Sequence, residues 1–181
     1  NDLSAFYFDI RKDVIYCDGK KSIERRSSRT LLDIIFNYLV RWFAPSLSFT
    51  TEEAWKSRNN DSSIHLEDFL ITPESYQNSE VNDIWITLKQ IRKVITGALE
   101  KKRADKIIGS SLEAHIDIYL EKSILEKVKN YQLDEISITS SFELHEITSN
   151  SEGFSLEEVS DVKVEVSKTS GQKCQRCWKY K

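Results

Sequence analysis

The 181-residue chain has 26 Lys and Arg, 29 Asp and Glu, a formal net charge of −3 and 39% hydrophobic residues. With only 5 Gly and 2 Pro, this composition excludes collagen-like, low-complexity and disordered classes. No apolar run approaches the ~20 residues of a membrane helix and no secretory signal opens the chain, so we expect a cytoplasmic protein without a membrane segment. Three cysteines, an odd number, favour a reducing compartment over a disulfide framework.

Residues 1–108 show the apolar spacing of α-helices, which predicts an antiparallel helix bundle. A helix end occupies residues 1–16, and Ser22 opens a long helix that Pro45 stops. After a polar stretch, a further helix covers residues 80–103. Its apolar face is predicted to consist of Val81, Ile84, Trp85, Leu88, Ile91, Ile95 and Leu99.

A short helix is also expected to begin near Thr50. Thr50 and Glu53 have the spacing of a capping box, and Phe49 and Ala54 are placed to form a hydrophobic staple across the first turn.

Residues 109–167 change to a period of two, which predicts a small α+β subdomain. The expected elements are strands at 112–119, 136–138, 142–144 and 162–166 and a helix over 123–131. His115 falls on the polar face of the first strand, where we expect it to be solvated. The chain is therefore predicted to be mainly α, with a helix bundle followed by this α+β part.

Residues 168–181 contain the strongest chemical motif, Cys174-Gln175-Arg176-Cys177-Trp178. Two cysteines at this spacing present both thiolates to one tetrahedral metal such as zinc. A zinc site needs four ligands, so the chain holds half of one, and we expect residues 168–181 to be mobile or held by accidental contacts. A redox pair and coincidence are the alternatives; the helical start of the chain argues against a thioredoxin-like unit.

Charge is segregated along the chain. Residues 81–109 carry seven basic and three acidic side chains, residues 110–167 carry four and 13, and residues 168–181 carry five basic and no acidic ones. A uniformly basic nucleic-acid binder is excluded, but a basic helix and a basic tail around an acidic stretch are not. Basic and aromatic residues are interleaved in the long helix and in the tail, as in proteins that bind single-stranded RNA loops.

Catalytic motifs are absent. The sequence has no Gly-rich phosphate loop, no nucleophile elbow and no dinucleotide-binding fingerprint. Its acidic pairs are adjacent in sequence, so the two carboxylates of a pair do not face one another on a helix or strand. We therefore assign no catalytic residue. The chain also lacks methionine and begins at Asn1, which we interpret as a piece of a longer protein.

Four segments, in order, resemble isoleucyl-tRNA synthetases of the bacterial type. They are DLSAFYFDIRKD at 2–13, LSFTTEEAW at 47–55, IIGSSLEA at 107–114 and GQKCQRCW at 171–178. Synthetases for valine and leucine share the helical domain, but the first and last segments are more similar to the isoleucine enzyme. The resemblance covers essentially the whole chain.

The resemblance implies a class I ligase that joins isoleucine to tRNA(Ile), using ATP and magnesium in its catalytic domain. This chain lacks that catalytic domain and the family's editing domain. It implies an anticodon-binding bundle over residues 1–108, the α+β subdomain over 109–167 and the first half of a zinc-binding module over 168–181. The expected partner is the tRNA(Ile) anticodon stem-loop, bound by a monomer. The candidate tRNA contacts are Arg25, Arg26, Arg29, Lys89, Arg92, Lys93, Arg176 and Trp178, and the candidate zinc ligands are Cys174 and Cys177.

Two other functions compete with this interpretation. The acidic stretch over residues 110–167 favours a protein-interaction helical module without an RNA role. A redox or zinc-delivery protein would use Cys174 and Cys177 alone.

Overall fold

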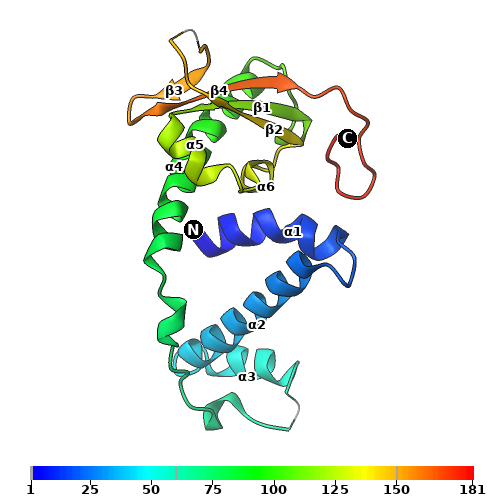
Figure 1. Cartoon of the computed structure of the whole chain (residues 1–181). Helices are drawn as coiled ribbons and strands as arrows, with labels where there is room; N and C mark the ends of the chain where they lie inside the picture. The colour runs from blue at the N-terminus through cyan, green and yellow to red at the C-terminus, as the bar shows by residue number, and fades with distance from the viewer. Residues whose placement is uncertain (1, 60, 150) are drawn as a thin grey trace. The chain divides into compact units, whose positions relative to one another are not determined.

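The computed structural model describes residues 2–59, 61–149 and 151–181, which form two compact units (Figure 1). We call Arg11–Gln77 the helical unit, and Asn1–Ile10 with Asn78–Lys181 the sheet unit. As predicted, the chain is mainly helical with a small α+β part. The structure does not divide at 108/109, because the helix before that point, Ser79–Ala104, shares its apolar core with the sheet.

The helical unit is built around the long helix α2 (Ile23–Phe43) and the shorter α3 (Ser48–Lys56). It also contains the end of α1 (Phe8–Cys17) and the turns η2 (Ile64–Leu66) and η3 (Glu74–Tyr76). Ser22 caps α2 as predicted, since its hydroxyl accepts a 3.2 Å hydrogen bond from the N–H of Arg25. The small core of this unit consists of Val40, Ala44, Trp55 and Ile64.

The first turn of α3 differs from the prediction. The helix begins at Ser48, and no side chain caps its first turn. The hydroxyl of Thr51 instead donates to the carbonyl of Leu47 at 2.9 Å. Phe49 is 92% exposed, so the predicted staple with Ala54 is wrong.

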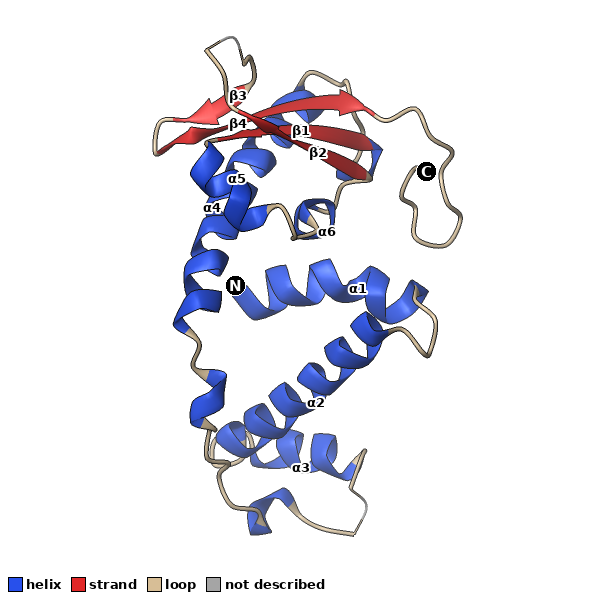
Figure 2. Cartoon of the chain, viewed as in Figure 1, coloured by secondary structure: helices blue, strands red, loops and turns tan. Residues whose placement is uncertain are grey.

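The sheet unit contains four strands, and Figure 2 shows them together in red. They are β1 (Ala114–Leu120), β2 (Ser141–Glu146), β3 (Phe154–Leu156) and β4 (Val159–Lys168). The order is β2-β1-β4-β3, with β1 parallel to β2 and the other pairs antiparallel. The helical segments of this unit are η1 (Asp2–Tyr7, a π-helix), the start of α1, α4 (Ser79–Ala104), η4 (Ser111–Glu113), α5 (Lys122–Val128) and α6 (Leu133–Ser137). The parallel β1–β2 pair requires a crossover, which α5 and α6 provide.

One face of the sheet is buried. In β1, Ile116 and Ile118 alternate with polar residues, and Val162, Val164 and Val166 do the same in β4. Helix α4 packs against β4 and β3, and Figure 1 shows α4, α5 and α6 on the same side of the sheet. The contact with β3 needs a glycine in α4, because a Cβ at Gly97 would lie 2.6 Å from the ring of Phe154.

Two further predictions need correction, and one strand was not predicted. Ile136 and Ile138 do not form a strand: Ile136 lies in α6, and Ile138 ends that helix in the left-handed conformation, with φ at 57°. These two apolar residues are two positions apart, which is the spacing of one strand face. Both pack in the core here because the helix ends between them. The three-residue strand β3 was not predicted. Val81 is exposed, so the buried face of α4 begins at Ile84.

Candidate nucleic-acid interface

Three of the predicted tRNA contacts lie together on α4. Lys89, Arg92 and Lys93 are three and four residues apart, a spacing that puts them on one helix face. With η1 they border a depression of about 430 Å³. It is lined by Ala5, Phe6, Lys89, Arg92, Lys93, Thr96, Gly97 and Glu100. This depression combines an apolar wall with three cations and one carboxylate.

Arg92 is part of the packing that forms this depression. Its Nε donates to the carbonyl of Ile136 at 3.1 Å, and its guanidinium lies 4.4 Å from the ring centre of Phe6. Burial lowers the pKa of Arg92, and the nearby Asp9 carboxylate opposes that change. The guanidinium stays charged at neutral pH. Arg92 therefore ties α4 to η1 and α6, whatever else it binds.

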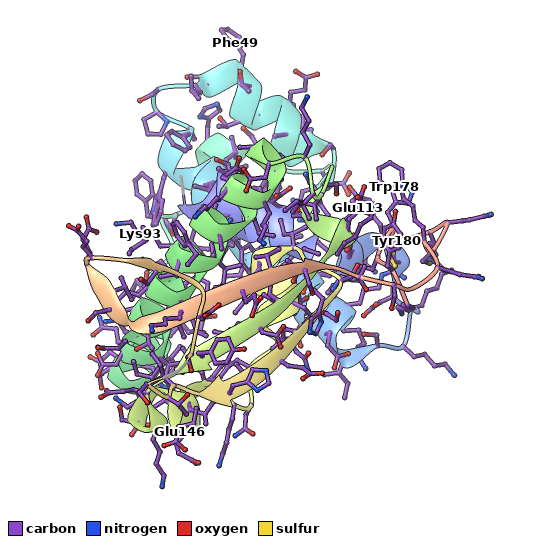
Figure 3. The ribbon with its side chains drawn as sticks, turned by 90° about the horizontal axis from the view of Figure 1, so that it is seen from above. Phe49, Lys93, Glu113, Glu146, Trp178 and Tyr180 are labelled. Atoms are coloured by element: carbon purple, nitrogen blue, oxygen red, sulfur yellow. The ribbon has the colours of Figure 1, made fainter. Side chains whose placement is uncertain are left out.

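Lys93 and Lys89 are more accessible than Arg92. Lys93 is exposed and forms an ion pair with Glu158 (Figure 3 labels Lys93). By hydrogen bonding and by its charge, Lys93 lowers the pKa of Glu158. An exposed pair of this kind contributes little net stability, so a phosphate can replace the carboxylate at little cost. Lys89 is exposed on the same helix face.

Three other predicted contacts, Arg25, Arg26 and Arg29, lie in the first turns of α2. Arg25 is half-buried, and its Nη1 donates to the carbonyl of Asp18 at 3.0 Å. Arg26 and Arg29 are exposed. Arg26 borders a second depression, of about 520 Å³, with Ile23, Ser27, Thr30, Leu31 and Ile34. The helical unit thus presents two accessible cations beside an apolar helix face.

The C-terminal tail forms a tight hairpin around the two cysteines. Cys174 N–H donates to Lys179 at 2.8 Å, and Trp178 N–H donates to Cys174 at 2.9 Å. Trp178 adopts the left-handed conformation, with φ at 64°. The hairpin requires Gly171, because a Cβ there would lie 2.7 Å from the backbone of Lys181.

Backbone N–H groups in this hairpin stabilise one thiolate. Hydrogen bonds from the backbone of Cys177 and Arg176, and then from the Cys177 side chain, lower the pKa of Cys174 to about 7. Both cysteines are free and half-buried. Among the described residues, no third His, Cys, Asp or Glu joins this pair in a metal-binding group. The hairpin therefore fits two ligands of a tetrahedral thiolate site.

Residues 168–181, expected to be mobile or held by accidental contacts, form an ion pair and hydrogen bonds with the rest of the sheet unit. Lys179 forms a 2.8 Å ion pair with Asp134, and both side chains are more than 80% buried. The N–H of Tyr180 donates to Ser140 at 2.7 Å, and the N–H of Thr169 donates to Glu113 at 2.9 Å.

Two candidate RNA contacts lie on the outer side of the tail hairpin. Trp178 is 60% exposed, and Figure 3 shows its ring standing out from the tail ribbon. The Lys173 ammonium lies 5.2 Å from the ring centre. Arg176, two residues before Trp178, is also exposed. This gives the tail an accessible aromatic ring beside the Lys173 cation.

Sequence reasoning missed the part that Phe6 plays in this interface. The sequence predicted only a helix end over residues 1–16, but the ring of Phe6 lies 5.3 Å from that of Trp85 and 4.4 Å from the Arg92 guanidinium. A cation–π contact between segments so far apart in sequence has no local signature, so only the fold could reveal it.

The chain belongs to the family of anticodon-binding domains of tRNA ligases, whose family model matches residues 1–118.

Its relatives include bacterial isoleucine–tRNA ligases, which confirms the resemblance found in the sequence. The chain is 49% identical over 179 residues to the isoleucine–tRNA ligase of Pelagibacter ubique. The aligned residues make up 98% of this chain and 19% of that ligase. It is 45% identical over 181 residues to that of Bartonella henselae, covering 99% of this chain and 19% of that protein. The chain thus spans about a fifth of the length of these relatives. Within the described residues, we find no helix long and apolar enough to span a membrane.

Proposed function

We propose that this chain is the tRNA-binding part of an isoleucine–tRNA ligase, and that it holds the anticodon stem-loop of tRNA(Ile) as a monomer in the cytoplasm. Activation of isoleucine with ATP and magnesium belongs, in this proposal, to parts of the ligase outside these 181 residues. The observation that supports it most is the cluster of Lys89, Arg92 and Lys93 beside an apolar wall, within a member of the anticodon-binding family.

The proposed contacts divide into two kinds. The accessible cations of α4 and α2, Lys89, Lys93, Arg26 and Arg29, contact phosphates, which position the RNA without reading its sequence. Trp178 and Arg176 contact bases, because an exposed ring beside cations suits stacking on unpaired nucleotides. Arg25 and Arg92 support these groups from partly buried positions.

Zinc is the metal that the hairpin of Cys174 and Cys177 fits. Backbone N–H groups already stabilise thiolate at Cys174, and a thiolate is the form that binds zinc. Zinc bound there would hold the hairpin closed and keep Trp178 and Arg176 in place. Cys174 and Cys177 supply two of the four ligands that such a site requires.

Salt-dependent tRNA binding tests the phosphate contacts. Lys89→Gln combined with Lys93→Gln should flatten the slope of log K against log salt by about 0.8 for each phosphate that no longer meets a lysine. The matched control is Lys122→Gln with Lys127→Gln, which removes two exposed lysines from α5 in the acidic stretch. Equal slopes for the two double variants would contradict the proposed interface.

The base contact has its own test. Trp178→Ala should weaken binding of tRNA(Ile) by about 1 to 3 kcal/mol and reduce the preference over a valine tRNA, because one base then has no ring to stack on. Trp178→Phe should retain most of both. If Trp178→Ala changes neither affinity nor preference, anticodon reading lies elsewhere.

A protein-interaction module without an RNA role is the second candidate. It is favoured by three large apolar side chains of the helical unit, Phe49, Leu66 and Ile71, each at least 85% exposed. This function predicts a protein complex that survives competition with excess tRNA. A complex displaced by tRNA would count against it.

A further inference from the structure

The uncovered face of the sheet carries an unusual row of charges. Asp117 at the centre of β1 lies directly opposite Glu143 of β2 and Glu165 of β4. Like charges directly opposite one another destabilise a sheet. Strand β1 begins just after Glu113, and its neighbour β2 ends at Glu146. Figure 3 labels these two residues near opposite ends of the sheet. The proposed RNA contacts do not use this face.

His115 lies on the same face of β1, two residues before Asp117, and is half-buried and held in place, contrary to the expectation that it is solvated. Its Nδ1 is 2.7 Å from the hydroxyl of Ser141, and its Nε2 is 3.7 Å from Asp117 Oδ2. When Nδ1–H donates to Ser141, Nε2 carries a lone pair that faces the carboxylate. Metal-ligating histidines are oriented in the same way, by a hydrogen bond from the nitrogen that does not bind the metal.

His145 fixes the other side of Asp117. Its Nε2 is 2.9 Å from Asp117 Oδ1, and its ring stacks on Tyr119 with centres 5.1 Å apart. This leaves the second oxygen of Asp117 facing His115. Asp117, Glu143 and Glu165 together give this face of the sheet a negative charge.

The ligand atoms of His115, Asp117 and Glu143 all lie within 4.8 Å of one another. Donors around a tetrahedral zinc are separated by ~3.4 Å, given metal–ligand bonds of ~2.1 Å. The ligand atoms therefore need to approach one another by at most about 1.4 Å. Glu143 is 66% exposed and can rotate to supply that movement.

We propose that His115, Asp117 and Glu143 form a binding site for a divalent transition metal ion of the zinc type, with Ser141 and His145 as positioning residues. An imidazole with two carboxylates suits zinc or cobalt better than calcium or magnesium, which prefer oxygen donors alone. Bound metal would relieve the repulsion in the carboxylate row. It would also link β1 to β2, the strand at the edge of the sheet.

Cobalt(II) binding to the 181-residue chain tests this proposal. Cys174→Ser with Cys177→Ser removes the thiol pair, so a remaining site gives a cobalt spectrum without the sulfur-to-metal charge-transfer band. Equilibrium dialysis should find one cobalt ion per chain in this background, displaced by zinc. Paramagnetic broadening should affect amides of β1 and β2 first.

Single variants in the same background assign the ligands. His115→Asn and Asp117→Asn should each abolish stoichiometric binding, and Ser141→Ala should weaken it about tenfold. His65→Asn is the matched control, since it removes an exposed histidine of the helical unit and should change nothing. Circular dichroism of each variant checks the fold.

Each result decides the proposal. Loss of binding in folded His115→Asn or Asp117→Asn, with binding kept in His65→Asn, supports it. Absence of stoichiometric binding in the thiol-free background, or binding that persists in both ligand variants, overturns it. Broadening centred outside β1 and β2 overturns it as well.

Discussion

Replacement of Arg92 by lysine separates a packing role from an RNA-binding role, because the positive charge is kept. The variant no longer makes the hydrogen bond from Nε to the carbonyl of Ile136, a residue that is only 9% exposed. A bond from a charged donor to a buried acceptor is worth about 2 kcal/mol. Lysine keeps part of the contact with the Phe6 ring. We therefore expect Arg92→Lys to lower the free energy of unfolding of the sheet unit by about 2 kcal/mol.

Urea unfolding followed at Trp85 measures this destabilisation, because Trp85 lies beside Phe6 in the same unit. Fluorine NMR of fluorotryptophan-labelled protein resolves Trp85 from the other tryptophans. With an m-value of about 2 kcal/mol/M, the midpoint should fall by about 1 M. Lys89→Gln, which removes an exposed cation one turn earlier, should change stability by less than about 0.5 kcal/mol. An unchanged midpoint for Arg92→Lys would refute the packing role assigned to the guanidinium.

Further predictions concern the core and the tail. Ile116→Ala, at a fully buried position of β1, should lower the free energy of unfolding by about 2 to 5 kcal/mol in urea, whereas Phe49→Ser on the surface of α3 should change it little. Cys174 should be alkylated at half its maximal rate near pH 7, its folded-state pKa, with rates resolved by mass spectrometry. This pKa is below the ordinary thiol value of 9.0, so ionisation of Cys174 should stabilise the folded tail. The stabilisation should be complete above about pH 9 and should be lost as the pH falls through about 7. Hydrogen exchange of the tail amides measures it.

Apolar periodicity and helix-capping residues correctly predicted those elements that depend on interactions between residues close in sequence. Ser22 at the start of α2 and the alternation through Ile116 and Ile118 both correspond to structure, because caps and strand faces are short-range features. The prediction failed at Ile136 and Ile138, where a spacing of two arose from a helix end in the left-handed conformation. A left-handed non-glycine residue is stabilised by its surroundings, so local sequence does not reveal it.

The candidate site was predictable as a set of residue types and not as an arrangement. The spacing of Lys89, Arg92 and Lys93 placed them on one helix face, and the structure does bring them together. Their partners, Phe6 and Glu158, come from distant segments that local patterns cannot pair with α4. The sequence also did not reveal that His115 lies close to Glu143, because this proximity depends on the register between β1 and β2.

The partners of each cation indicate how much of the predicted positive charge an RNA can use. Arg92 and Lys179 are engaged by partly buried groups, and breaking those bonds to bind a phosphate would leave a carbonyl or carboxylate without compensation. The ion pair of Lys93 with Glu158 is exposed, so a phosphate could replace that carboxylate at almost no cost. The salt dependence of tRNA binding should therefore count the exposed cations, Lys89 and Lys93 among them, and change little when Lys179 is replaced. A slope that falls equally for Lys179→Gln would mean that the tail detaches from Asp134 to bind RNA.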